Sequence, residues 1–297
     1  LIRKMKIKVC VMGLGYVGLP LSIELSKHFP FIGFDISKAR VSQLNRQIDI
    51  NNEFKIKELK NIKNRVTSEY ENLNNFNFFI ITVPTPINKK LKPNLRPLNN
   101  CFKLLKKIQI NNSIIVVEST VYPGLTEMLF KKYFPKANEV GLRIGYSPER
   151  INPGDKKNTL KSISKIISAQ DKATLLKIRK VYGKITRNLI QSNSIQEAEF
   201  AKAIENTQRD INIAFVNEIA AFSQKINCNI FHVLELAKTK WNFLDFKPGM
   251  VGGHCIGVDP YYLKDLAKRK NFKTKMIISG RETNEKVFRV LGKKILD

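Results

Sequence analysis

The sequence has few cysteines, and their spacing fits neither a metal site nor a disulfide framework. The 297 residues include four, with no C-x-x-C pair and no histidine at ligand spacing. Three of them, Cys10, Cys101 and Cys228, lie in otherwise apolar surroundings. We therefore expect no metal, no disulfide and a reducing compartment. Cys255 differs, because glycines surround it.

Long hydrophobic runs are also missing. No stretch approaches the roughly 20 apolar residues that a membrane-spanning helix needs. The first residues alternate basic and apolar side chains and lack the apolar core and cleavage site of a signal peptide. With 43% hydrophobic and 26% charged residues, the composition is that of an ordinary globular protein. We expect a soluble, cytoplasmic protein with no membrane partner.

Acidic residues are scarce. There are 25 Asp and Glu against 52 Lys and Arg, which gives a net charge of +27. Such an excess permits nucleic-acid binding, but most of the basic residues are lysines scattered among Asn and Ile, with no arginine-rich arm or basic block. We interpret the positive charge as a compositional bias and expect no nucleic-acid partner. The same charge favours the binding of small anionic ligands.

The order of predicted elements indicates two domains. Over residues 1–190, short apolar runs alternate with helical patterns, which is typical of an α/β fold with a doubly wound, Rossmann-type parallel sheet. From residue 191 to 297 only helical periodicity remains, so an all-helical central domain should follow. The predicted strands are 7–12, 31–34, 76–83, 113–118, 142–146 and 164–168, and the later helices are 196–226, 230–237, 260–269 and 273 to the end.

A glycine motif joins the first predicted strand to the first helix. Gly13, Gly15 and Gly18 form G-x-G-x-x-G, with Tyr16 and Val17 inside it. Gly13 permits the tight turn, Gly15 lets the backbone approach a pyrophosphate, and Gly18 lets helix and strand pack. Asp35, twenty positions after Gly15, would bind ribose hydroxyls and repel a 2′-phosphate. The pattern therefore favours NAD over NADP, although Lys38 and Arg40 nearby weaken that preference.

Two further segments end predicted strands at the same edge of the sheet. One runs from Thr82 to Pro86 and contains Thr85, and the other runs from Glu118 to Gly124 and contains Thr120. Such positions line the crevice where open α/β sheets bind ligands. Their prolines are equally compatible with simple strand-ending turns.

Cys255 lies in a glycine-dense loop, Gly249–Asp259, directly ahead of a predicted helix. Glycines give access to the thiol, and a helix N-terminus would lower its pKa toward the reactive thiolate. The plainer alternative is a small residue in a tight loop. Asp259, followed by Pro260, could equally be an ordinary helix N-cap.

Three polar residues fall on one stripe of the helix expected from residue 196. Glu199, Lys202 and Asn206 stand at i, i+3 and i+7, whereas apolar residues occupy the other faces. The stripe is either a solvated face or the lining of a site, and the spacing alone does not distinguish them.

Together these segments resemble the UDP-glucose/GDP-mannose dehydrogenase family, and within it the UDP-N-acetylglucosamine and UDP-N-acetylgalactosamine 6-dehydrogenases that supply surface polysaccharides. The segments occur in family order along the whole chain. The segments that carry the resemblance are Gly13–Gly18, Val83–Pro86, Glu118–Thr120 with Pro123-Gly124, Tyr146–Gly154, Ala201–Thr207 and Gly252–Tyr262, with Thr239–Phe243 before the last.

The resemblance implies a four-electron oxidation in which the C6 alcohol of a UDP-N-acetylhexosamine becomes a carboxylate and two NAD⁺ become NADH. Cys255 would form a thiohemiacetal and then a thioester. By the same resemblance Lys202 and Asn206 steady the oxyanion, Asp259 and Thr120 hold water or relay protons, and Glu149 is the acid/base of thioester hydrolysis. The implied cofactor residues are Gly13, Gly15, Tyr16, Val17, Gly18, Asp35, Thr85 and Thr120, and the implied substrate residues are Glu149, Arg150, Asn152, Lys202, Asn206 and Gly252.

The resemblance also implies a homodimer through the central helices, and one departure from the pattern. Family chains carry a second Rossmann-like domain that binds most of the UDP, whereas this chain begins with Leu and stops at Asp297 in what looks like the connecting helix. We expect a fragment that binds NAD but turns over poorly alone. The alternatives are a non-catalytic NAD-binding fragment and a two-electron hydroxyacid dehydrogenase, which would need no cysteine.

Overall fold

The chain forms two compact units in a computed structural model that describes residues 6–151, 159–251 and 256–296. One unit comprises Leu1–Thr85 with Asn94–Lys202, and the other comprises Pro86–Pro93 with Ala203–Asp297. None of the described helices is both long and apolar enough to cross a membrane.

The first unit is built on one sheet, whose strands follow the order β3-β2-β1-β4-β5-β6-β7-β8. The order reverses between β1 and β4, as in a doubly wound fold. Short apolar runs form most of the strands, as their composition predicts. Their bounds are β1 (Val9–Met12), β2 (Phe31–Phe34), β3 (Val66–Thr67), β4 (Phe78–Ile81), β5 (Ile114–Val117), β6 (Arg143–Tyr146), β7 (Ser164–Ala169) and β8 (Asn188–Gln191).

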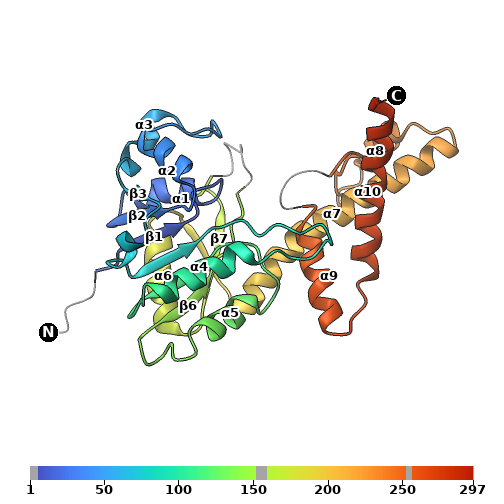
Figure 1. The fold of residues 1–297 in the computed structure, drawn as a ribbon. Helices are drawn as coiled ribbons and strands as arrows, with labels where there is room; N and C mark the ends of the chain where they lie inside the picture. The colour runs from blue at the N-terminus through green and yellow to red at the C-terminus, as the bar shows by residue number, and fades with distance from the viewer. Residues whose placement is uncertain (1–5, 152–158, 252–255, 297) are drawn as a thin grey trace. The chain divides into compact units, whose positions relative to one another are not determined.

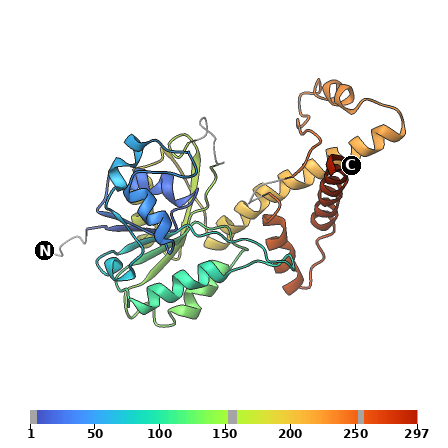
Figure 2. The ribbon, with the colours of Figure 1, turned by 45° about the horizontal axis from the view of Figure 1, so that its top comes forward.

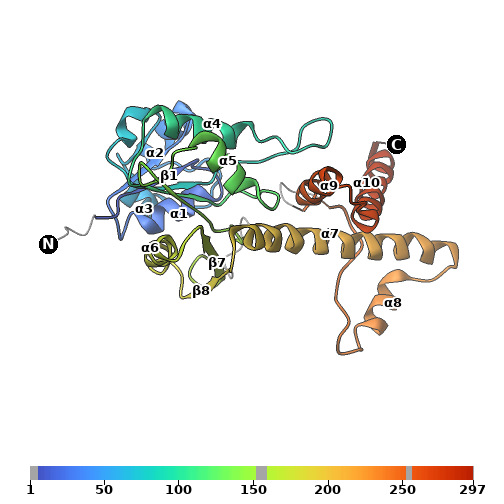
Figure 3. The ribbon, with the colours of Figure 1, turned by 90° about the horizontal axis from the view of Figure 1, so that it is seen from below.

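Helices cover both faces of this sheet. Figure 3 shows α4 and α5 on one face and α1 and α6 on the other. Because side chains alternate along a strand, Val9 and Val11 enter the core beneath α1 and α6, together with Ile178 and Tyr182. The helices of this unit are α1 (Gly18–Leu25), α2 (Lys38–Asn45), α3 (Ile56–Leu59), α4 (Arg96–Lys107), α5 (Leu125–Tyr133) and α6 (Lys172–Tyr182).

The sheet departs from the expected parallel arrangement at one junction. β6 pairs with β7 in the antiparallel sense, through Gly145 with Ala169 and Tyr146 with Ser168, whereas β7 and β8 are parallel to each other. An antiparallel neighbour needs no crossover helix, so β7 begins at the edge of the sheet where β6 ends.

The second unit is helical and includes most of one long helix. α7 (Ile195–Lys225) is a single helix of 31 residues, whose uninterrupted course is visible in Figure 2. It begins in the first unit and continues through the second. α8 (Ile230–Ala237), α9 (Asp259–Arg269) and α10 (Lys275–Leu296) follow it (Figure 1).

Candidate functional site

The turn between β1 and α1 is shaped by its three glycines. Gly13 has φ +99°, in the left-handed region that favours glycine. A Cβ on Gly18 would lie 1.8 Å from the carbonyl oxygen of Gly13, so only glycine fits there. A Cβ on Gly15 would meet no atom within 4 Å, so the backbone of Gly15 faces open space. This is the form of a phosphate cradle at a helix N-terminus. Tyr16 is half exposed, and Val17 is the N-cap residue of α1.

Asp35 lies beside this turn, directly after β2. Its carboxylate accepts hydrogen bonds from the backbone N–H of Leu14 at 2.8 Å and of Ser37 at 2.9 Å. Arg40 is buried, its Nε donating to the carbonyl of Leu14 at 3.0 Å and its Nη1 pairing with Asp49 at 2.9 Å. These contacts hold the Arg40 guanidinium in the protein interior, away from the place of a 2′-phosphate. Arg40 therefore no longer weakens the preference for NAD over NADP.

The segments that follow β4 and β5 are tied to each other. The hydroxyl of Thr85 donates to the carbonyl of Thr120 at 2.8 Å, and the hydroxyl of Ser119 donates to the carbonyl of Val83 at 2.6 Å. The structure therefore brings together two predicted cofactor residues, Thr85 and Thr120, at the carboxyl edge of the sheet.

Glu149 and Arg150 follow β6 at the same edge. Glu149 is buried, and its Oε1 accepts hydrogen bonds from the backbone N–H of Arg150 at 2.6 Å and of Ile151 at 2.7 Å. Arg150 donates to the carbonyl of Ser164 at 3.1 Å. The other carboxylate oxygen of Glu149 faces the ammonium of Lys165 at 3.8 Å.

Lys165 belongs to a buried network that the sequence did not reveal. Its ammonium donates to Glu118 at 2.8 Å, and Glu118 also accepts a hydrogen bond from the hydroxyl of Tyr182. Burial would lower the pKa of Lys165, but Glu118 and Glu149 outweigh it and raise that pKa, so the ammonium stays charged. The only signal in the sequence is a lysine inside an otherwise apolar strand.

Two residues of the polar stripe at the start of α7 are buried, and the third, Asn206, is half-buried. Glu199 is inaccessible to solvent, and its carboxylate accepts hydrogen bonds from the backbone N–H of Gly124 at 2.5 Å and of Thr126 at 2.9 Å, at the N-terminus of α5. Burial raises the pKa of Glu199 to about 7. Lys202, one turn later, is also buried. The stripe is thus not a solvated face.

Two predicted catalytic residues, Asn206 and Asp259, meet in the helical unit. The amide of Asn206 donates a hydrogen bond to the buried carboxylate of Asp259. Asp259 is the first residue of α9, and the N-cap is Val258. The N-cap interpretation of Asp259 is therefore wrong, because the N-cap position of α9 falls on Val258.

The remaining predicted residues lie outside the described part of the chain. These are Cys255, Asn152 and Gly252. Of the other cysteines, Cys10 and Cys101 are buried, and burial raises the pKa of both thiols. Cys228 is exposed, contrary to the apolar surroundings that its sequence neighbours suggested. None of these three forms a disulfide.

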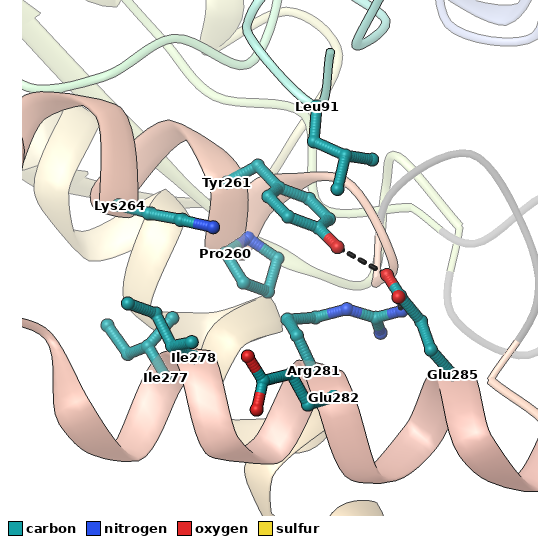
Figure 4. Close-up of a pocket in the computed structure, with 9 residues that line it drawn as sticks. All are labelled: Leu91, Pro260, Tyr261, Lys264, Ile277, Ile278, Arg281, Glu282 and Glu285. Atoms are coloured by element: carbon teal, nitrogen blue, oxygen red, sulfur yellow. Dashed lines mark hydrogen bonds and ion pairs between the residues drawn. The ribbon is translucent and has the colours of Figure 1, made fainter. Parts of the chain in front are cut away.

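A small pocket lies between α9 and α10 in the helical unit (Figure 4). The hydroxyl of Tyr261 donates to the carboxylate of Glu285, and the guanidinium of Arg281 lies 5.8 Å from the centre of the Tyr261 ring. Leu91 completes one wall. None of the predicted site residues lines this pocket. Among the described residues, no three His, Cys, Asp or Glu side chains are grouped as metal ligands.

Comparison with known proteins identifies the two parts of the chain. Residues 7–186 match the NAD binding domain of the UDP-glucose/GDP-mannose dehydrogenase family, and residues 196–286 match its central domain. The cradle at Gly13–Gly18 and the position of Asp35 agree with NAD as the cofactor.

Individual relatives cover nearly the whole chain. A UDP-N-acetyl-D-glucosamine 6-dehydrogenase of Salmonella typhi is 42% identical over 98% of this chain and 70% of its own length. Protein CapL of Staphylococcus aureus is 43% identical over 97% of this chain and 69% of its own length. A solved UDP-D-ManNAc dehydrogenase of Pyrococcus horikoshii matches with a TM-score of 0.85 at 28% identity, over 97% of this chain and 72% of that one. The chain belongs to the UDP-glucose/GDP-mannose dehydrogenase family, and it is an NAD-dependent oxidoreductase.

Proposed function

We propose that the chain oxidises the C6 alcohol of a UDP-N-acetylhexosamine to the carboxylate, through a thioester on Cys255, for the synthesis of a surface polysaccharide. The observation that carries the proposal is the hydrogen bond from half-buried Asn206 to buried Asp259 in the helical unit. It ties the first residue of α9, four positions after Cys255, to α7. Two relatives at 42% and 43% identity are named UDP-N-acetyl-D-glucosamine 6-dehydrogenase, and these names support the substrate class.

The chemistry explains why a thiol is needed. NAD, when bound, accepts the hydride in each of the two oxidations. Oxidation of the alcohol to the aldehyde requires only a base beside that acceptor, whereas the second oxidation requires an adduct that holds the aldehyde carbon. The Cys255 thiolate supplies it by adding to that carbon. Loss of a hydride leaves a thioester, and water then releases the acid and the thiol. One alcohol and one water thus yield one carboxylate, two NADH and three protons.

Other residues hold charge and move protons in this scheme. Lys202 and Asn206 stabilise the oxyanion that forms when the thiolate adds, and Lys202 also takes the alcohol proton. Asp259 and Thr120 orient the hydrolytic water. Glu149 exchanges a proton with it, and the two backbone N–H groups on its Oε1 fix the direction of its other oxygen.

Product stoichiometry tests the proposal. Because we expect the chain to turn over poorly alone, it is used at high concentration in a long incubation with NAD and UDP-N-acetylglucosamine or UDP-N-acetylgalactosamine. NADH and uronic acid are then quantified together. We expect two NADH for each sugar consumed, and no uronic acid with Cys255→Ser. One NADH per sugar would instead indicate a two-electron dehydrogenase. An unchanged result with Cys255→Ser would exclude the thioester.

A further inference from the structure

A short arm between β4 and α4 belongs to the helical unit. Residues Pro86–Pro93 group with α8, α9, α10 and most of α7, whereas the residues before and after them belong to the first unit. The polypeptide therefore passes between the two units three times, after Thr85, before Asn94 and after Lys202. Any change in how the arm packs on the helices is transmitted along the chain to Thr85 and Asn94.

The arm is a tight hairpin. Ile87 and Pro93 pair across its base. Asn88 closes the turn, because its Oδ1 accepts hydrogen bonds from the backbone N–H of Lys90 at 2.9 Å and of Lys92 at 3.2 Å. The N–H of Asn88 also donates to the carbonyl of Lys92 at 2.8 Å. A two-stranded hairpin by itself is marginally stable at best in water, so the arm needs a contact outside itself to stay ordered.

Leu91 follows the turn in a backbone conformation that leucine rarely adopts. Its φ is +56°, in the left-handed region. Among the described residues, seven other non-glycine residues have a positive φ, and all seven carry amide side chains. They are Gln47, Asn52, Asn64, Gln109, Asn112, Asn227 and Asn271. Leucine at position 91 therefore costs conformational energy that an asparagine would avoid, and a contact of its side chain has to offset that cost.

The contact that Leu91 makes lies within the helical unit. Its side chain forms one wall of the small pocket between α9 and α10, beside the ring of Tyr261 (Figure 4). Pro260, Ile277 and Ile278 line the same pocket with apolar groups. Leu91 is 41% exposed, so more than half of its surface is covered, although the residues on either side of it are exposed. This apolar contact anchors the arm on the helices.

The base of the arm is part of the predicted cofactor site. Thr85 directly precedes the arm, and its hydroxyl donates to the carbonyl of Thr120. Both are predicted NAD residues at the carboxyl edge of the sheet. A ligand that contacts a segment binds more tightly when that segment is already restricted, because less conformational entropy is lost on binding.

We propose that Leu91 is a positioning residue for NAD. By anchoring the arm on α9 and α10 it restricts Thr85 and so couples the cofactor site of the first unit to the helical unit. Leu91 contacts no cofactor in this account. Because such coupling is reciprocal, NAD must in turn strengthen the docking of the arm. This role concerns the cofactor alone and does not depend on the sugar substrate or on the nucleophile.

Two measurements on the full chain test this role, and neither needs turnover. Calorimetric titration gives the affinity for NAD, and hydrogen exchange read by peptide mass spectrometry gives the protection of the arm with and without NAD. Leu91→Asn suits the left-handed backbone but removes the apolar side chain, and we expect it to bind NAD at least about fivefold more weakly. Without NAD, the arm should exchange faster in this variant than in the parent. NAD should slow exchange in the arm of the parent and not in that of the variant.

Matched variants separate positioning from general damage. Leu91→Met keeps an apolar side chain of similar volume and should behave like the parent in both measurements. Leu91→Gly also fits the left-handed backbone, and it should reproduce the loss seen in Leu91→Asn. Leu176→Asn makes the same change at an exposed leucine on α6 and should leave the NAD affinity and the arm unchanged. Urea unfolding should show Leu91→Asn as folded as the parent under the conditions of the titration.

Each remaining outcome contradicts a different statement. If the arm exchanges at the same rate in the parent and in Leu91→Asn, Leu91 is not its anchor. If the arm of the variant exchanges faster but NAD binds as tightly as in the parent, the role of Leu91 in NAD binding is overturned. An equal loss of affinity in Leu176→Asn would assign the effect to a general property of the surface. None of these outcomes bears on the oxidation of the sugar, which the product stoichiometry tests.

Discussion

At the scale of single residues, the carboxylate of Glu199 couples folding to pH. Because burial raises its pKa to about 7 from an ordinary value of 4.5, the folded state holds more protons than the unfolded state between these values. The free energy of unfolding that Glu199 contributes is therefore fully present below about pH 4.5 and is lost as the pH rises through about 7.

We expect Glu199→Gln to remove this dependence. Relative to the variant, the parent should lose at most about 3 kcal/mol between pH 4.5 and pH 8, since one pKa unit corresponds to about 1.4 kcal/mol. Urea unfolding at several pH values measures the difference, and exposed Glu197→Gln on the same helix is the control. A parent that gains stability relative to Glu199→Gln over this range would contradict the sign.

Lys165 is the residue whose loss should cost most. In Lys165→Met the carboxylate of Glu118 keeps its burial but loses its ion pair, and breaking a buried pair on one side costs about 3–5 kcal/mol. Urea unfolding should show this loss. Lys161→Met is the matched control, because Lys161 pairs with Glu24 at 3.6 Å on the surface, where such pairs contribute about 0–1 kcal/mol. Equal losses in the two variants would contradict the expectation.

At the scale of elements, two glycines of the β1–α1 turn have different roles, one in protein stability and the other in NAD binding. Gly18→Ala should destabilise the protein by about 1–3 kcal/mol or more, because its Cβ overlaps the carbonyl of Gly13. Gly15→Ala should change stability by less than about 1 kcal/mol but weaken NAD binding, because its methyl group occupies the space the pyrophosphate needs.

Urea unfolding and calorimetric titration with NAD distinguish these two effects. We expect Gly15→Ala to unfold at the urea concentration of the parent and to bind NAD less tightly. The assignment fails if Gly15→Ala is as unstable as Gly18→Ala, or if it binds NAD as tightly as the parent.

The same elements show what the sequence could predict. Buried strands such as β4 and β5 follow from short apolar runs. The G-x-G-x-x-G glycines locate the dinucleotide site because they lie between a predicted strand and a predicted helix, with Asp35 twenty positions after Gly15. β3 has two residues and β8 is partly exposed and polar, so neither leaves a periodic signal. The direction of β7 was also not predictable, because alternation along a strand carries no information about the direction of its neighbour.

Contacts between residues that are distant in the sequence could not be predicted either. The bond between Lys165 and Glu118 spans 47 residues, and the bonds of Asn217 to Gly249 span 32. A lysine in a strand or an asparagine on a helix has no local feature that reveals such a partner. Lys202 and Asn206 were found because the family resemblance points to them, and their helical spacing was compatible with a solvated face.

At the scale of the whole molecule, apolar side chains remain exposed on the helical unit. They lie on α7 and α8, and a monomer of 34.1 kDa gains nothing by exposing them to water. We propose that a second copy of the chain covers them, as the family resemblance implies. The exposed residues are Ile204, Phe215, Phe222, Phe231 and Leu236.

Sedimentation velocity tests the homodimer. The parent should sediment as a dimer at micromolar concentration, and Phe215→Asp should shift it toward the monomer, because a charge buried in an apolar interface is costly. Leu176→Asp on α6 replaces an equally exposed apolar side chain in the other unit and should leave the dimer intact. A monomeric parent would overturn this expectation.

The length of α7 has a consequence for how the gene can change. Glu199, Asn206 and Asn217 are separated by seven and eleven residues, which are close to two and three turns, so the three side chains share one face. Deleting one residue between Glu199 and Asn206 would rotate both asparagines by about 100° about the helix axis relative to Glu199, so the three side chains would no longer share one face. Substitutions can accumulate along α7. Insertions and deletions in this helix are tolerated only when their length is close to a whole number of turns, which keeps the three side chains on one face. We therefore expect differences in chain length to occur in the loops.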